Sequence, residues 1–67
     1  MWIIARTKGD YTELFMDRHQ IDRSGEWRAH DKGLPLQFDH EFRALHEMYK
    51  QMDIDPDWEY EVREYLD

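Results

Sequence analysis

Apolar residues recur at helical spacing in the stretch DHEFRALHEMYKQM, residues 39–52. Four of them share one face of an α-helix because they are three or four positions apart: Phe42, Leu45, Tyr49 and Met52. Asp39 is a residue type that favours the N-cap position. Glu41 near the start and Lys50 near the end have the charges that the helix dipole favours. We therefore predict a helix over residues 39–52.

The residues before this helix alternate between short strand-like runs and turns. Residues 2–6 are apolar and partly β-branched, and residues 11–17 have strand-like content. Gly9 lies between these runs in a turn-forming stretch, so the N-terminus predicts a β-hairpin. Residues 26–30 predict a third strand, and a proline in residues 34–38 keeps that run extended.

The residues after this helix fit two structures. Trp58, Tyr60 and Val62 alternate with charged residues, which is typical of a strand. The Asp-Pro pair at 55–56 is a good N-cap and first helical residue, and the following Glu and Arg residues are good helix formers. On balance we predict a second helix in residues 56–66.

Size and composition limit the architecture to one small domain over residues 1–67. A chain this short buries only about 60% of the surface that its unfolded form exposes. It has no cysteine for a disulfide, but it has three Trp, four Tyr and three Phe, which contribute large buried areas. We predict an α+β fold with an antiparallel sheet of about three strands, packed by helix 39–52 and a second, C-terminal helix.

Nothing in the sequence indicates a membrane segment. The apolar run at the N-terminus, residues 1–5, is far shorter than the roughly 20 residues that span a bilayer. The lack of cysteine fits a reducing compartment. We therefore expect a cytoplasmic protein that does not bind membranes.

Charge is distributed unevenly along the chain. The net charge is −7, yet residues 1–36 contain six basic and six acidic side chains, which cancel. Residues 37–67 contain three basic and ten acidic side chains. An acidic surface repels nucleic acid and attracts basic protein surfaces. We expect a protein partner with a basic surface and no direct binding of DNA or RNA.

Acidic residues alternate with aromatic residues in the C-terminal stretch. Carboxylates on a rigid element can imitate the phosphates of a nucleic acid, and aromatic side chains beside them can anchor in the partner. The residues expected to contact the partner are Asp53, Asp55, Asp57, Trp58, Glu59, Tyr60, Glu61, Glu64 and Tyr65. In size, acidity and lack of cysteine the chain resembles phage-encoded inhibitors of host nucleic-acid machinery. This resemblance implies a stoichiometric inhibitor or regulator of a nucleic-acid-handling protein.

Two other functions compete with this hypothesis. The chain is alternatively a structural or accessory subunit that docks through an apolar face. Residues 53–64 also resemble the calcium loop of an EF-hand, because acids occupy positions 1, 3, 5, 7, 9 and 12 of the window. Trp58 stands where the loop requires glycine, and only three residues follow Glu64, which leaves no room for the exit helix. We therefore predict no metal or other cofactor.

Catalytic motifs are weak in this sequence. No cysteine nucleophile exists, and the single serine, Ser24, lies in a turn-like Arg-Ser-Gly stretch. The three glycines are isolated, so no phosphate-binding loop is formed. Sixteen acidic residues do not make an acid–base site without a cleft that separates their pKa values. We predict that the protein is not an enzyme.

Self-association is expected to be weak. Four apolar residues lie where one thin core would not reach them all: Ile3, Phe15, Met48 and Ile54. A symmetric dimer would bury such surface, but seven net negative charges oppose it. We therefore predict a weak homodimer through the N-terminal hairpin, whose charge cancels, and not through residues 53–67.

Overall fold

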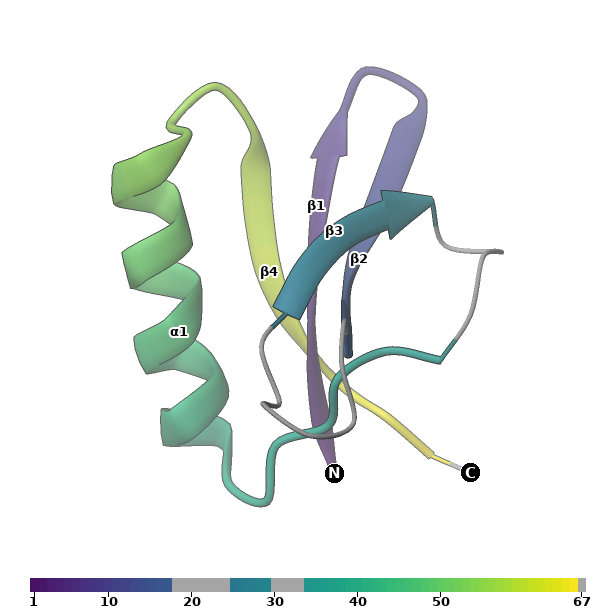
Figure 1. Cartoon of the computed structure of the whole chain (residues 1–67), viewed down its shortest axis with the longest axis vertical. Coiled ribbons are helices and arrows are strands. Elements are labelled where there is room, and N and C mark those ends of the chain that lie inside the picture. Colours follow the sequence, from purple (N-terminus) through teal and green to yellow (C-terminus); the bar gives the residue numbers. More distant parts are fainter. Residues whose placement is uncertain (18–24, 30–33, 67) are drawn as a thin grey trace.

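Four antiparallel strands and one helix make up the fold in a computed structural model that describes residues 1–17, 25–29 and 34–66 (Figure 1). The elements in chain order are β1 (Trp2–Lys8), β2 (Tyr11–Asp17), β3 (Gly25–Ala29), α1 (Glu41–Ile54) and β4 (Glu59–Glu64). The strand order is β3-β2-β1-β4, and α1 packs against β1 and β4. The predicted α+β class is confirmed.

The N-terminal hairpin is confirmed. β1 and β2 are paired from Ala5 opposite Leu14 to Lys8 opposite Tyr11. Gly9 has a φ of 62°, a left-handed conformation that glycine adopts without the steric cost of a Cβ atom. The hairpin therefore follows from a local signal, a glycine placed between two strand-forming runs.

Residues 34–38 join the far ends of β1 and β2, beyond the paired part of the hairpin. The Trp2 N–H donates to the Phe38 carbonyl at 2.9 Å, and the Phe38 N–H donates to the Trp2 carbonyl at 2.8 Å. The Leu36 N–H donates to the Phe15 carbonyl at 2.8 Å. The run that the sequence predicts as extended thus supplies partners for backbone groups of both strands.

The C-terminal residues form a strand and not the predicted second helix. β4 pairs antiparallel with β1 from Glu59 opposite Thr7 to Glu64 opposite Trp2. Asp55 does not begin a helix but is the C-cap of α1, and its N–H donates to the Gln51 carbonyl. The prediction is wrong because pairing with a strand distant in sequence outweighs the local helix preference of Glu and Arg.

Helix α1 is confirmed, with shifted ends. It starts at Glu41 after the N-cap His40, which has extended dihedral angles, so Asp39 lies one residue before the cap. Its buried residues are Ala44 and Met48. The Ala44 side chain is fully buried, and its small size lets the helix approach the sheet closely at this position. Most of the apolar row identified in the sequence consequently lies on the solvent side.

The core lies between α1 and one face of the sheet. Ile4, Phe15, Ala44 and Met48 are buried together. Partly buried apolar residues pack around them: Trp2, Trp27, Leu36, Phe38, Leu45, Tyr60 and Val62. Of the four residues suspected of lying outside the core, Ile3, Phe15 and Met48 are buried and only Ile54 is exposed.

The packing of this core requires a glycine at the start of β3. A Cβ atom at Gly25 would overlap the aromatic ring of Phe15, which lies in the core. Gly25 is paired with Asp17 of β2 and therefore lies in the sheet. This close approach requires a residue without a side chain.

Among the residues that the structure describes, no helix is long and apolar enough to cross a membrane.

Candidate functional site

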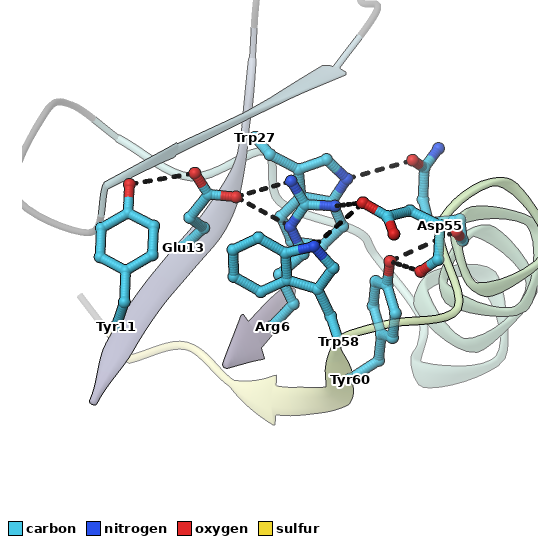
Figure 2. A network of polar contacts seen from close by, with 8 residues as sticks. Arg6, Tyr11, Glu13, Trp27, Asp55, Trp58 and Tyr60 are labelled. Atoms are coloured by element: carbon cyan, nitrogen blue, oxygen red, sulfur yellow. Dashed lines mark hydrogen bonds and ion pairs between the residues drawn. The ribbon is translucent and has the colours of Figure 1, made fainter. Parts of the chain in front are cut away.

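A largely buried arginine, Arg6, lies at the end of the molecule where α1 ends and β4 begins (Figure 2). The guanidinium of Arg6 on β1 lies between the indole rings of Trp27 and Trp58, with Cζ 4.3 Å and 4.1 Å from the two ring centroids. Arg6 also contacts the Glu13 carboxylate on β2, with Nη2 2.6 Å and Nε 2.8 Å from Oε1. The two side chains are only 12% and 13% exposed. The attraction between the opposite charges of Arg6 and Glu13 offsets part of the cost of removing both groups from water.

The same arginine reaches the turn between α1 and β4. Its Nη1 lies 3.7 Å from Oδ2 of Asp55. The indole N–H of Trp58 donates to that carboxylate at 3.0 Å, and the Tyr60 hydroxyl donates to the Asp55 carbonyl (Figure 2). The first residues after α1 are therefore held in place by side chains from β1 and β4.

A second branch of this network connects β3 to α1. The indole N–H of Trp27 donates to Oε1 of Gln51 at 3.1 Å, and Nε2 of Gln51 donates to Oε2 of Glu47 at 2.9 Å. Within residues 1–17, 25–29 and 34–66, no buried side-chain nitrogen or oxygen lacks a hydrogen-bond partner. We call the residues of both branches the Arg6 network: Arg6, Glu13, Trp27, Glu47, Gln51, Asp55, Trp58 and Tyr60. Its interactions point to a structural role.

Carboxylates point outward from the strand and turn that this network holds. Tyr60 and Val62 of β4 pack toward α1, so Glu59, Glu61 and Arg63 point to the opposite side of the strand. Nε of Arg63 donates to Oε1 of Glu61 at 2.9 Å on the exposed surface. We name the exposed acids of this region the acidic edge: Asp53, Asp57, Glu59, Glu61 and Glu64. Arg63 is the single basic residue within this stretch.

The nine residues predicted to contact a partner fall into two groups. The five members of the acidic edge are exposed. The other four are partly buried: Asp55, Trp58, Tyr60 and Tyr65. Asp55, Trp58 and Tyr60 belong to the Arg6 network, and the backbone N–H of Tyr65 donates to the Met1 carbonyl. The structure thus gives the Trp58 and Tyr60 side chains contacts within the molecule.

Sequence reasoning missed the residue at the centre of the network. Arg6 and Glu13 are cross-strand partners in the hairpin, and opposite charges at such positions stabilise a sheet. A two-residue turn at Gly9 and Asp10 sets this register, so the pair was visible in the sequence. The stacking of Arg6 between Trp27 and Trp58 was not, because both tryptophans come from distant segments.

The window that resembles a calcium loop has a different geometry. Residues 53–64 form the end of α1, a turn and β4, so their carboxylates do not converge on one point. The Asp55 carboxylate faces Arg6 and Trp58. In the part of the chain that the structure describes, no three His, Asp or Glu side chains form a group able to hold a metal ion.

A second exposed surface lies on α1. We name Phe42, Leu45, Tyr49 and Met52 the α1 row; Phe42, Tyr49 and Met52 are 65%, 60% and 37% exposed, and Leu45 is half-buried. Three basic or ionisable side chains follow one flank of the row and are exposed: Arg43, His46 and Lys50. A hollow of about 570 Å³ beside the start of the row is lined by Phe38, Phe42, Arg43 and His46.

Comparisons with known proteins identify no relative: no family model, no curated protein and no solved structure matches this chain.

Proposed function

We propose that this chain is a protein-binding module whose acidic edge binds a partner with a basic surface. The observation that carries the proposal is a set of five exposed carboxylates on the last turn of α1, the turn that follows it and the edge strand β4. Arg63 is the one basic residue in this stretch of sequence, and the exposed Lys8 borders it, with Nζ 4.6 Å from the centroid of the Trp58 ring. Complementary charge on two proteins speeds their encounter and selects against partners of the wrong sign. The acidic edge is suited to such recognition.

Rigidity of the acidic edge supports this proposal. The Arg6 network holds Asp55, Trp58 and Tyr60, which are neighbours in sequence of Asp57, Glu59 and Glu61. Side chains displayed on a pre-organised element lose less conformational entropy on binding than side chains on a flexible tail. The network therefore serves the acidic edge indirectly, by fixing the backbone that carries it.

The position of β4 in the sheet also supports a protein partner. β4 is the last strand in the order β3-β2-β1-β4, so one side of its backbone has no strand partner among the described residues. Exposed charges on such an edge prevent pairing with a second identical edge. Here the charges are negative, so a basic segment is the kind of chain that the edge accepts.

The partner class that we propose is a nucleic-acid-handling protein, which the chain would inhibit or regulate in stoichiometric amounts. Such proteins present basic surfaces to phosphates. Alternate residues of a strand are roughly 6.6 Å apart and point to one side, so Glu59 and Glu61 present two carboxylates at this spacing, followed on the same side by Arg63, which pairs with Glu61. Both the role of nucleic-acid mimic and the cytoplasmic setting stay predictions.

Affinity capture from the native host tests this function. The wild type is compared with the variant Glu59→Gln/Glu61→Gln/Glu64→Gln. The control variant, Asp10→Asn/Asp39→Asn/Glu41→Gln, loses three exposed acids elsewhere. We expect one retained protein with a basic surface, held at low salt by the wild type and the control but not by the first variant. Equal loss in both variants would show that only net charge matters and would reject the acidic edge as the site.

Docking through an apolar face is a second candidate function, and the α1 row favours it. Phe42 and Tyr49 on this helix face are 65% and 60% exposed. Exposed apolar patches flanked by polar residues commonly mark sites of protein association. This surface adjoins the acidic edge, because Asp53 of the acidic edge directly follows Met52 of the row on α1.

A further inference from the structure

Backbone groups along β4 alternate between those bonded to β1 and those that face outward. In an antiparallel pair of strands, hydrogen-bonded positions alternate with non-hydrogen-bonded ones. The Tyr65 N–H donates to the Met1 carbonyl, whereas the N–H and carbonyl of Trp2 bond to Phe38 on the other side of β1. Met1 and Tyr65 therefore stand at a hydrogen-bonded position, and the next pair, Trp2 opposite Glu64, at a non-hydrogen-bonded one.

This alternation determines which backbone groups of β4 are free. Along the register with β1, the odd-numbered residues from 59 to 63 turn their N–H and carbonyl groups to β1. The same groups of Tyr60, Val62 and Glu64 point away from β1, and β4 is the last strand of the sheet. Within the part of the chain that the structure describes, no hydrogen bond occupies these six groups.

A partner chain can bind such an edge by strand addition. Backbone hydrogen bonds to an exposed sheet edge then give affinity, and alternate side chains give specificity. All strand pairs of this sheet are antiparallel, and antiparallel pairing is slightly more stable per residue than parallel pairing. We propose that the basic partner binds through an extended segment that adds antiparallel to β4 as a further strand. This inference rests on the proposed function, because it takes the same acidic edge as the site.

Charge determines which side chains the added strand carries. In an antiparallel pair, opposite residues point to the same face, and at non-hydrogen-bonded positions their Cα atoms are only about 4.5 Å apart. Glu59 and Glu61 occupy such positions toward the added strand, because their own backbone groups are bonded to β1. Two basic residues, two positions apart, can therefore lie opposite these exposed carboxylates. Arg63 continues the row and pairs with Glu61, so a basic residue opposite Arg63 gains nothing.

The two edges of the sheet differ in the charge that they present. Residues 57–64 contain four acidic side chains and one basic side chain, so a second copy of β4 would bring two net negative segments together. The other edge strand, β3, carries Glu26 and Arg28, with Nη1 of the arginine 3.7 Å from Oε1 of the glutamate. That pair is neutral overall and selects neither sign. Among the described strands, β4 is the edge that favours a basic segment.

Backbone methylation of a model peptide tests strand addition. The probe is the capped peptide Thr-Lys-Thr-Lys-Thr-Lys-Thr, whose lysines alternate with a strand-forming residue. When the lysines lie opposite Glu59 and Glu61, the threonine amides face β4 and the lysine amides face away from it. NMR titration in dilute protein at low salt measures the dissociation constant.

The two sets of amides should respond differently. We expect N-methylation of three threonines to weaken binding at least about tenfold, and N-methylation of the three lysines to weaken it about twofold or less. The two modified peptides have the same charge and the same number of methyl groups. Equal effects, or a greater loss from the lysine set, would overturn the proposal.

The charge variant Glu59→Gln/Glu61→Gln/Glu64→Gln separates this inference from the proposed function. If the variant loses the unmethylated peptide while the two methylated peptides behave alike, the acidic edge remains the site and strand addition is rejected. If the variant binds the unmethylated peptide as tightly as the wild type does, the acidic edge itself is rejected.

Proline at residue 64 gives a matched test on the protein. Glu64→Pro and Glu64→Gln remove the same charge, but only proline removes the N–H that faces outward. Edge strands tolerate proline where the N–H points to solvent, so we expect similar melting temperatures. We expect Glu64→Pro to bind the unmethylated peptide about three- to tenfold more weakly than Glu64→Gln. Equal binding by the two variants would contradict the proposal, and if proline lowers the melting temperature, the methylated peptides still decide.

Discussion

The outer face of α1 and the strand β4 come from the same highly charged half of the chain, yet they differ in character. The α1 surface combines an apolar row with two basic and two acidic exposed side chains, Arg43, Lys50, Glu41 and Asp53, whereas β4 and the turn before it display four exposed carboxylates and one arginine. The fold separates side chains that are neighbours in sequence onto different surfaces. A net charge of −7 therefore describes neither surface, and the two should select different partners.

Loss of the Arg6 network should have the largest effect on both surfaces. Arg6→Ala leaves the largely buried Glu13 carboxylate without its cation, with the Tyr11 hydroxyl still donating to it, and removes the cation between two indole rings. Breaking a fully buried ion pair on one side costs about 3–5 kcal/mol of folding free energy, and this slightly exposed pair should lie at the lower end of that range. We expect a loss of this size in urea unfolding, which would leave a domain this small largely unfolded.

The matched control for this change is Arg63→Ala. Arg63 pairs with Glu61 on the exposed surface, where such pairs contribute about 0–1 kcal/mol. Arg6→Lys should fall between the two, because lysine retains the charge but loses the planar fork. If Arg6→Ala and Arg63→Ala had equal effects, the Arg6 network could not be what holds the acidic edge.

A smaller effect is expected at Gly25. Alanine there would place a Cβ atom in the ring of Phe15, a core residue that α1 also covers. Overpacking of this kind costs about 1–3 kcal/mol. Thermal unfolding of Gly25→Ala should show a lower melting temperature. A melting temperature equal to that of the wild type would mean that β3 and Phe15 are not in close contact.

The structure shows which of these features local sequence could predict. The hairpin and α1 follow from signals within a few residues, a glycine between two strand-like runs and an apolar repeat at helical spacing. β4 could not be predicted this way, because its competing helix and strand patterns are decided by pairing with β1. The helical spacing of the apolar residues predicted the α1 row. It could not predict that α1 contacts the sheet through Ala44, which leaves most of the row exposed.

The exposure of the candidate site could be predicted in part, whereas its role in binding stays a prediction. Acidity along residues 53–64 is visible in composition, and the acids of this stretch other than Asp55 are exposed. The Trp58 ring packs on Arg6, some 50 residues earlier, so local sequence could not show that this side chain belongs to the internal network.

Salt should affect partner binding and self-association in opposite directions. An increase in ionic strength from about 0.01 M to 0.15 M shortens the Debye length from about 30 Å to about 8 Å. We expect binding of a basic partner at the acidic edge to weaken, because the attraction is screened. We expect any weak self-association to tighten modestly, by about two- to threefold, because repulsion between two molecules of charge −7 is screened. Sedimentation equilibrium across this range measures it; self-association that loosens with salt would show that attraction between charges drives it.

The central claim is that the fold separates this half of the chain into two surfaces of different charge. An NMR titration of the backbone amides with a short lysine-rich peptide tests it most directly. The measurement is made in dilute protein at low salt. We predict chemical-shift changes concentrated at residues 57–64, with little change at residues 42–52, because the cationic peptide avoids the flank of Arg43 and Lys50. Changes spread evenly over α1 and β4 would contradict the account, since they would show that the peptide responds only to the overall negative charge.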